Sequence, residues 1–145
     1  MPAFVALLAR DLEVSVLIDG GREGKDAQRL LSQAAKGLIT EQEICFLAEA
    51  DGLPPKADIE DVFSPTDYLR LFNWAFNKRL SPADIQSIGQ RIVPQLEQHD
   101  GVYDHVLPAY ELTRRLDEFF ATVEPDTLSK FEKLIARLNS TIPLV

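Results

Sequence analysis

Carboxylate side chains follow two apolar runs of this chain. Asp19 comes directly after the run 14–18, and Glu60 and Asp61 follow the run 43–48 after a turn-rich loop. If both runs are parallel strands, their carboxyl ends meet at one edge of a sheet and the acids could converge there. Mg²⁺ and Mn²⁺ take such oxygen ligands and assist phosphodiester cleavage. These acids could therefore form a metal site, but acids in such loops more often cap helices or face solvent.

Another candidate for acid–base chemistry is His105. It precedes Val106 at the expected entrance of a helix, where an imidazole could donate a proton or contact a phosphate. A structural or exposed histidine is the alternative. With two histidines and one cysteine the chain is a poor candidate for a zinc site. It also lacks a P-loop, a Rossmann glycine fingerprint and a nucleophile elbow.

The composition limits the classes of function. A formal net charge of -8 argues against a surface that binds nucleic acid all over, because phosphate contacts need clustered lysine and arginine. Basic residues of the last helices are interpreted first as solvated charge and second as a phosphate-contacting surface. No apolar run is long enough to span a membrane, and no secretory signal opens the chain, so we expect a cytoplasmic protein. The single cysteine, Cys45, lies in an apolar run and is expected to be buried rather than nucleophilic.

The elements that would position the acids form a strand–helix–strand unit. The predicted strands are 14–18 and 43–48, and the helix between them has Ala27, Leu30 and Ala34 on one face and ends at Gly37. Such a unit has parallel strands. We therefore expect an α/β fold with a partial parallel sheet of few strands flanked by helices, followed by an all-helical C-terminal part.

Helical patterns dominate the remainder of the chain. A short helix is predicted over 2–10, and a serine–proline cap is expected to open helices at Ser64 and again at Ser81, the second continuing to Leu96 with Pro94 bending or ending it. Two further helices are predicted, one from Leu112 to Phe120 and one after Pro125.

The order of these motifs resembles a known nuclease family. The run Val16–Gly20, the helix and strand that follow, and the segment Asp58–Phe63 before Asp67 are similar to the second half of a Toprim domain. More narrowly, they resemble the C-terminal nuclease region of the overcoming-lysogenization-defect (OLD) family of ATP-dependent endonucleases. By this resemblance, residues 1–78 form a Toprim-like α/β half-domain and residues 79–145 a helical extension packed on it.

The resemblance implies cleavage of DNA that depends on Mg²⁺ or Mn²⁺. Asp19 stands at the first acid of the family's Asp-x-Asp motif and Glu60 at the acid of its Ile-Glu-Asp segment, and both are then metal ligands together with Asp61. His105 falls roughly where the family has a catalytic lysine. The catalytic residues expected on this basis are Asp19, Glu60 and His105.

Two positions depart from the family's pattern. Gly21 stands where the motif has its second acid, for which Glu23 or Asp61 could substitute, and the glutamate of the first Toprim strand would lie before Met1. We therefore expect an upstream ATPase domain or subunit and treat this chain as an incomplete nuclease region. The alternative is a catalytically degenerate module for protein interaction or homodimer formation, since a half-sheet has an edge that can pair with a second copy.

Overall fold

The computed structural model describes residues 14–85 and 90–142. The helix predicted over 2–10 lies outside these residues. The chain divides into two compact units: unit 1 comprises Met1–Asp58 and Glu132–Val145, and unit 2 comprises Ile59–Phe131. These bounds differ from the expected parts 1–78 and 79–145, because the helix after Ser64 packs with the later helices of unit 2.

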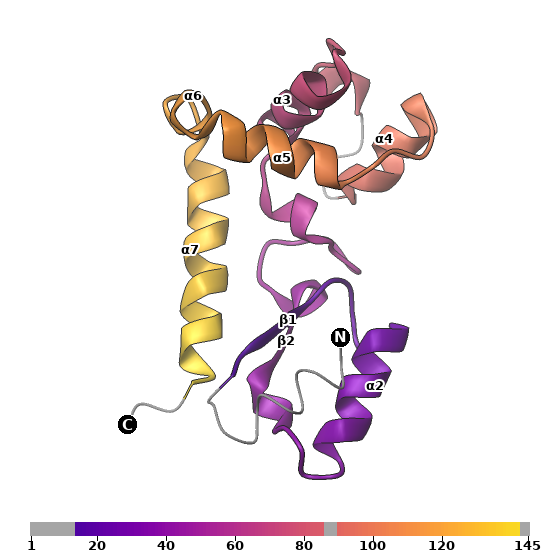
Figure 1. Ribbon diagram of the computed structural model, residues 1–145, viewed down its shortest axis with the longest axis vertical. Helices are drawn as coiled ribbons and strands as arrows, with labels where there is room; N and C mark the ends of the chain where they lie inside the picture. The colour runs from indigo at the N-terminus through magenta and orange to yellow at the C-terminus, as the bar shows by residue number, and fades with distance from the viewer. Residues whose placement is uncertain (1–13, 86–89, 143–145) are drawn as a thin grey trace. The chain divides into compact units, whose positions relative to one another are not determined.

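The sheet of unit 1 confirms the predicted parallel pairing. Strand β1 (Val16–Ile18) pairs with β2 (Ile44–Phe46) so that Leu17 lies opposite Cys45. Helix α2 (Lys25–Ala34) lies between them in the chain and beside them in space (Figure 1). Both strands are shorter than their apolar runs, and β2 is limited on both sides by the 3-10 turns η1 (Glu41–Glu43) and η2 (Leu47–Glu49).

Helix α2 closes the core of unit 1. Its buried Ala27 and Leu30 pack with Ile44 and Phe46 of β2. The chain then turns at Gly37, which has a φ of 71°. The N–H groups of Gly37 and Leu38 donate to the carbonyls of Ala34 and Gln33, the bond pattern of a Schellman motif. The glycine C-cap read from the sequence is thus confirmed, and Cys45 is buried as expected.

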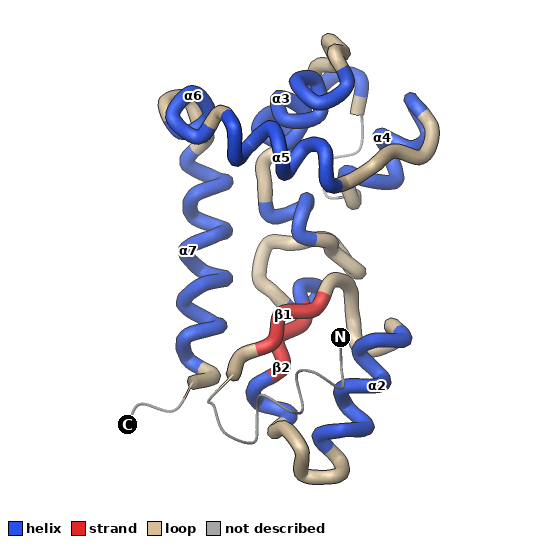
Figure 2. Tube along the Cα trace, in the orientation of Figure 1, coloured by secondary structure: helices blue, strands red, loops and turns tan. Residues whose placement is uncertain are grey.

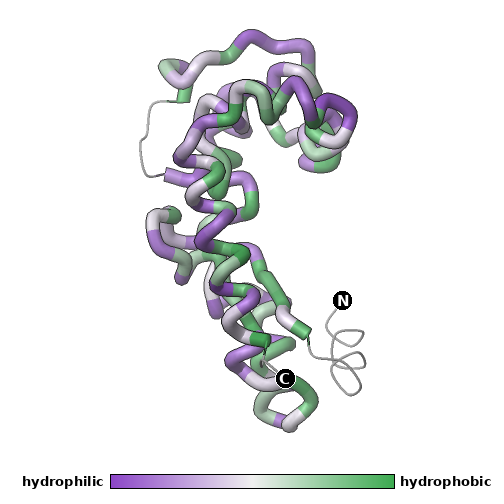
Figure 3. The backbone as a smooth tube through the Cα atoms, turned by 90° about the vertical axis from the view of Figure 1, so that its left-hand side faces the viewer, coloured by the Kyte–Doolittle hydropathy of each residue, from purple (hydrophilic) through white to green (hydrophobic). Residues whose placement is uncertain are grey.

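Helices make up unit 2, as the blue segments of Figure 2 show. Their bounds are α3 Pro65–Phe76, α4 Ile92–Asp100, α5 Val106–Arg114 and α6 Leu116–Phe120, with 3-10 turns η3 (Ile59–Val62) and η4 (Pro82–Asp84). Helix α7 (Pro125–Ser140) begins in unit 2 and ends in unit 1. Figure 3 shows hydrophilic and hydrophobic residues mixed along the helices of the chain.

One buried carboxylate joins segments of unit 2 that lie far apart in sequence. Ser64 caps α3 through its side chain, as predicted, by accepting from the N–H of Asp67. The fully buried Asp67 in turn accepts from the Thr127 hydroxyl at 2.6 Å and from the Glu124 N–H at 3.0 Å, and pairs with Arg70. The apolar core around it comes from α3, α4 and α6, with Phe72, Leu96 and Phe119 among its buried members.

Two helix predictions for this unit are wrong in their extent. The Ser81–Asp84 capping box closes only the single turn η4, since Ile85 leaves the helical region with φ -114° and ψ 88°. Helix α4 starts at Ile92, so Pro94 lies in its first turn, where a missing N–H leaves no hydrogen bond unmade. The predicted helix over 112–120 is divided at Arg115, whose φ of -124° interrupts it between α5 and α6.

Within its described residues, the chain is an α/β protein with two parallel strands and six α-helices. Helix is the main secondary structure. None of the described helices has both the length and the apolar character that a membrane span requires.

Candidate functional site

The four predicted site residues belong to different units. Asp19 lies in unit 1, whereas Glu60, Asp61 and His105 lie in unit 2.

In unit 1, Asp19 is exposed in the turn that follows β1. The next residue, Gly20, has a φ of 74°, a conformation that favours glycine. Its N–H donates to the Ala57 carbonyl at 2.7 Å, and its carbonyl accepts from the Ala48 N–H at 3.1 Å. These bonds hold the turn against the segments after β2, as expected for the carboxyl edge of a parallel sheet.

Glu23 comes close to the position of the family's second acid. A Cβ added at Gly21 would lie 2.5 Å from the Glu23 Oε2, so the Glu23 carboxylate reaches the space that a side chain at residue 21 would enter. Lys56 lies 3.8 Å from the other oxygen of that carboxylate. This turn thus carries two acids, Asp19 and Glu23, and Glu23 lies close to Lys56.

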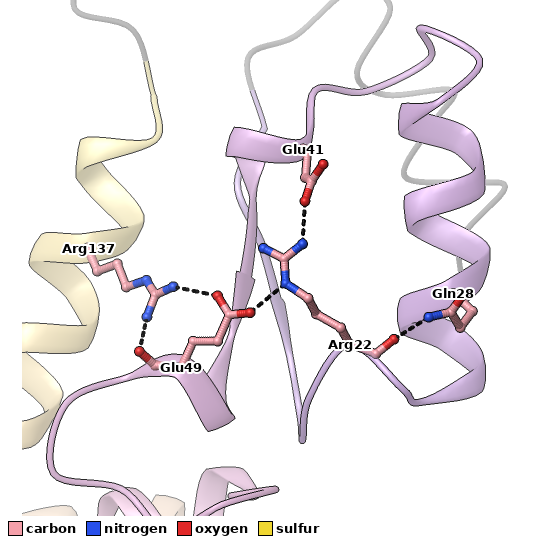
Figure 4. Close-up of polar contacts among 5 residues, drawn as sticks. All are labelled: Arg22, Gln28, Glu41, Glu49 and Arg137. Carbon is pink, nitrogen blue, oxygen red and sulfur yellow. Dashed lines mark hydrogen bonds and ion pairs between the residues drawn. The ribbon is translucent and has the colours of Figure 1, made fainter.

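A charged network that the sequence reasoning missed surrounds Arg22 in the same turn (Figure 4). The Arg22 side chain pairs with Glu41 and, at 2.6 Å from its Nε, with Glu49. Arg137 of α7 also donates to the Glu49 carbonyl at 2.8 Å. The hydrogen bonds that Arg22 donates to Glu49 and Glu41 raise the pKa of Arg22 above its ordinary value. The carboxylates of Glu41 and Glu49 balance the positive charge of Arg22, and these ion pairs stabilise the turn.

In unit 2, two predicted residues meet. Nδ1 of His105 lies 2.9 Å from Oε1 of Glu60, across 45 residues of sequence. Glu60 comes from η3 and His105 is the N-cap residue of α5, the helix entrance that the sequence predicted. The Glu60 side chain is 12% exposed and that of His105 is 45% exposed. The carboxylate is therefore sheltered while the imidazole reaches solvent.

Aromatic rings hold the imidazole from one side. The His105 ring stacks on Tyr103 with centroids 4.7 Å apart and planes 21° from parallel. The Tyr103 hydroxyl lies 3.3 Å from that of Tyr68, which is 3% exposed. Burial, and then the bond to Tyr103, raises the pKa of Tyr68 far above its ordinary value. Tyr68 is therefore a neutral phenol that supports the ring stack.

Asp61 has a structural contact. It is 7% exposed and its Oδ1 accepts from the Ile92 N–H at 2.7 Å, at the start of α4. A carboxylate at this end of a helix satisfies a donor that has no partner inside the helix. Asp61 thus caps a helix, which is one of the two alternatives to metal binding that the sequence left open.

The Glu60–His105 pair can do acid–base chemistry. An ionised carboxylate only accepts hydrogen bonds, so Nδ1–H of His105 donates to Glu60. This tautomer leaves Nε2 with a lone pair that can take a proton. A carboxylate behind the imidazole also stabilises the imidazolium that forms when Nε2 takes one.

The described histidine, cysteine and acidic residues do not form a metal centre by themselves. Within residues 14–85 and 90–142, no group of three histidine, cysteine, aspartate or glutamate side chains is arranged to hold a metal ion. The metal requirement thus stays a prediction from the resemblance.

Comparison of the chain with protein-family models, with curated proteins and with solved structures gives no match. The likeness to Toprim nucleases rests on the residues quoted above.

Of the residues that support the pair, the sequence reasoning missed Tyr103. Its signal was weak, since its only visible link to the pair is that it lies two residues before His105. Only the fold brings it against Phe72 and Phe76 of α3, with ring centroids at 5.0 and 5.5 Å.

Proposed function

We propose that this chain hydrolyses phosphodiester bonds of DNA, with His105 as the acid–base group and Glu60 as the residue that orients it. The observation that carries the proposal is the 2.9 Å contact between His105 Nδ1 and Glu60 Oε1. The sequence resemblance named both residues as catalytic candidates, and it supplies DNA as the substrate.

In this mechanism Nε2 of neutral His105 takes a proton from water while the water oxygen attacks phosphorus. The imidazolium that forms is stabilised by the Glu60 carboxylate at Nδ1. It then returns the proton from Nε2 to the leaving sugar oxygen as the bond from phosphorus to that oxygen breaks. The imidazole ends the cycle neutral, as it began.

Other parts of the proposal rest on the resemblance alone. These are the Toprim-like arrangement of the α/β unit, an upstream ATPase, and dependence on Mg²⁺ or Mn²⁺. When bound, a divalent ion would supply charge stabilisation to the phosphate. The acid–base steps above use only residues of this chain.

The test is a cleavage assay with the full chain. Fluorescently labelled single-stranded and double-stranded DNA are incubated with Mg²⁺, with Mn²⁺ or with a chelator. We expect His105→Ala to slow cleavage by about 10²–10⁴-fold, the usual share of general acid–base catalysis. His99→Ala, which removes the other histidine at an exposed position of α4, is the matched control and is expected to cleave like the unmodified chain.

Each result of this assay separates the alternatives. If the chelator abolishes cleavage, the result supports metal dependence. If cleavage continues in the chelator, the proposed metal requirement is wrong. If the folded, unmodified chain cleaves neither DNA under any condition, the proposal that this chain cleaves DNA by itself is wrong and the non-catalytic interaction module is favoured.

A further inference from the structure

A pocket of about 560 Å³ lies in unit 2 at the C-terminal end of α3. Residues along α3 from Thr66 to Trp74, the segment 77–82 and Arg115 line it. It is separate from the Glu60–His105 pair, since neither residue is among those that line it.

The segment beside the pocket is held at several points. Asn77 adopts the left-handed conformation that ends α3, with φ 50°, and the Lys78 N–H donates to the Asn73 carbonyl at 3.1 Å. The Asn73 side chain then bonds both backbone groups of Leu80, at 2.8 and 2.9 Å. Lys78 and Arg79 therefore lie in a stretch of backbone that is fixed before any ligand arrives.

The charge of the lining is one-sided. Four cationic residues, Arg70, Lys78, Arg79 and Arg115, line the pocket and no acidic residue does, in a chain whose formal net charge is -8. Three of these cations have carboxylate partners, none of which lines the pocket: Arg70 pairs with Asp67, Lys78 with Asp100, and Arg115 with Glu111 and Glu118. Within the described part of the chain, Arg79 is exposed and has no carboxylate partner.

Trp74 orients the arginines. The Arg115 guanidinium lies 5.0 Å from the Trp74 ring centroid and that of Arg70 lies 5.7 Å from it, both within the range of cation–π contacts. Glu111 also accepts from Arg115 Nε at 2.9 Å. The side chains of Lys78 and Arg115 are still 44% and 38% exposed, so a ligand in the pocket can reach both.

We propose that this pocket binds a phosphate group. Arginine and lysine are the side chains that bind phosphate oxygens best, arginine through its planar pair of donors and lysine as a point charge. The group can be a phosphodiester of a nucleic-acid strand or free phosphate, and the test separates these sources. The inference does not rest on the proposed function, because it requires binding without hydrolysis.

The single tryptophan of the chain is the probe for this binding. Fluorescence of Trp74 is recorded in the full chain during titration with inorganic phosphate, with a short single-stranded DNA, and with sodium chloride at matched ionic strength. We expect saturable changes with phosphate-bearing ligands and none with sodium chloride. The double variant Lys78→Ala with Arg79→Ala should bind about tenfold or more weakly.

The control is the double variant Arg29→Ala with Lys36→Ala in unit 1. It removes one arginine and one lysine, both exposed, far along the chain from the pocket, and is expected to bind as tightly as the unmodified chain.

Saturation by both DNA and inorganic phosphate, or by DNA alone, supports the proposal with a strand phosphodiester as the source. Saturation by inorganic phosphate alone supports it with free phosphate as the source. The proposal is overturned if neither saturates, if sodium chloride gives the same change, or if both double variants bind equally.

Discussion

Nδ1 of His105 lies 2.9 Å from Oε1 of Glu60, and the two residues reach this contact from a helix entrance and from a 3-10 turn. The fold thus brings a sheltered carboxylate to the back of an exposed imidazole. The contact joins two residues that the sequence had singled out for separate reasons, and it is the basis of the acid–base mechanism.

The contact predicts the tautomer of His105. Because Glu60 accepts from Nδ1, the neutral imidazole should carry its proton on Nδ1 and have its lone pair on Nε2. Long-range ¹H–¹⁵N spectra of the imidazole measure this directly. In Glu60→Ala the population should move toward the Nε2–H tautomer, whereas His99 should give the same spectrum in both proteins. An Nε2–H tautomer of His105 in the unmodified chain would contradict the assignment.

Asp67 is predicted to be the carboxylate on which the stability of unit 2 depends most. Asp67→Ala leaves the Thr127 hydroxyl, the Glu124 N–H and Arg70 without their buried acceptor. Loss of one partner from a buried charge pair costs about 3–5 kcal/mol, and we expect a decrease of that size in the free energy of unfolding. Urea denaturation measures it.

The matched control for Asp67 is Asp126→Ala. Asp126 is also an acid in the first turn of a helix, but its side chain is 60% exposed and pairs with Lys130 at the surface. Its removal should cost less than about 1 kcal/mol. Equal losses for the two variants would show that the Asp67 contacts do not carry the stability assigned to them.

The raised pKa of Tyr68 predicts that the folded chain loses stability at alkaline pH. Its folded-state pKa is raised, first by burial, above an unfolded-state value of about 10. Its contribution is therefore complete below about pH 10 and falls as pH rises toward the folded pKa, because only the unfolded chain releases the proton. The slope for this one group approaches ~1.4 kcal/mol per pH unit.

Denaturation of the unmodified chain, of Tyr68→Phe and of Tyr110→Phe between about pH 9 and pH 11 tests this slope. Tyr68→Phe should lose this part of the pH dependence. Tyr110, which is 58% exposed, should have no such effect when replaced. A Tyr68→Phe protein with the full alkaline slope would contradict the prediction.

The local elements of unit 1 were predictable because their signals are local. The run of apolar residues that contains β1, the helical spacing of Ala27 and Leu30, and the glycine at residue 37 each specify a conformation within a few residues. The serine–proline cap at Ser64 is of the same kind. The same serine–proline cap at Ser81 led to the wrong prediction of a long helix, because a cap begins a helix but does not determine its length. Here Ile85 already leaves the helical region.

Contacts between distant residues could not be read from the sequence. Asp61 follows an expected strand, and nothing local indicates that it accepts from the Ile92 N–H. Asp67 was recognised only as an acid in the first turn of a helix, whereas its bonds to Thr127 and Glu124 depend on packing. The Glu60–His105 contact is also of this kind, since the sequence proposed each residue but not their meeting.

The most direct test of the account is a double-mutant cycle on DNA cleavage. Single-turnover rates are measured for the unmodified chain, Glu60→Gln, His105→Ala and the double variant. Because Glu60 acts through His105, the double variant should be no slower than His105→Ala alone. Rates that fall by the product of the two single effects, or that do not change in any variant, would contradict the claim that the two residues act as one acid–base pair.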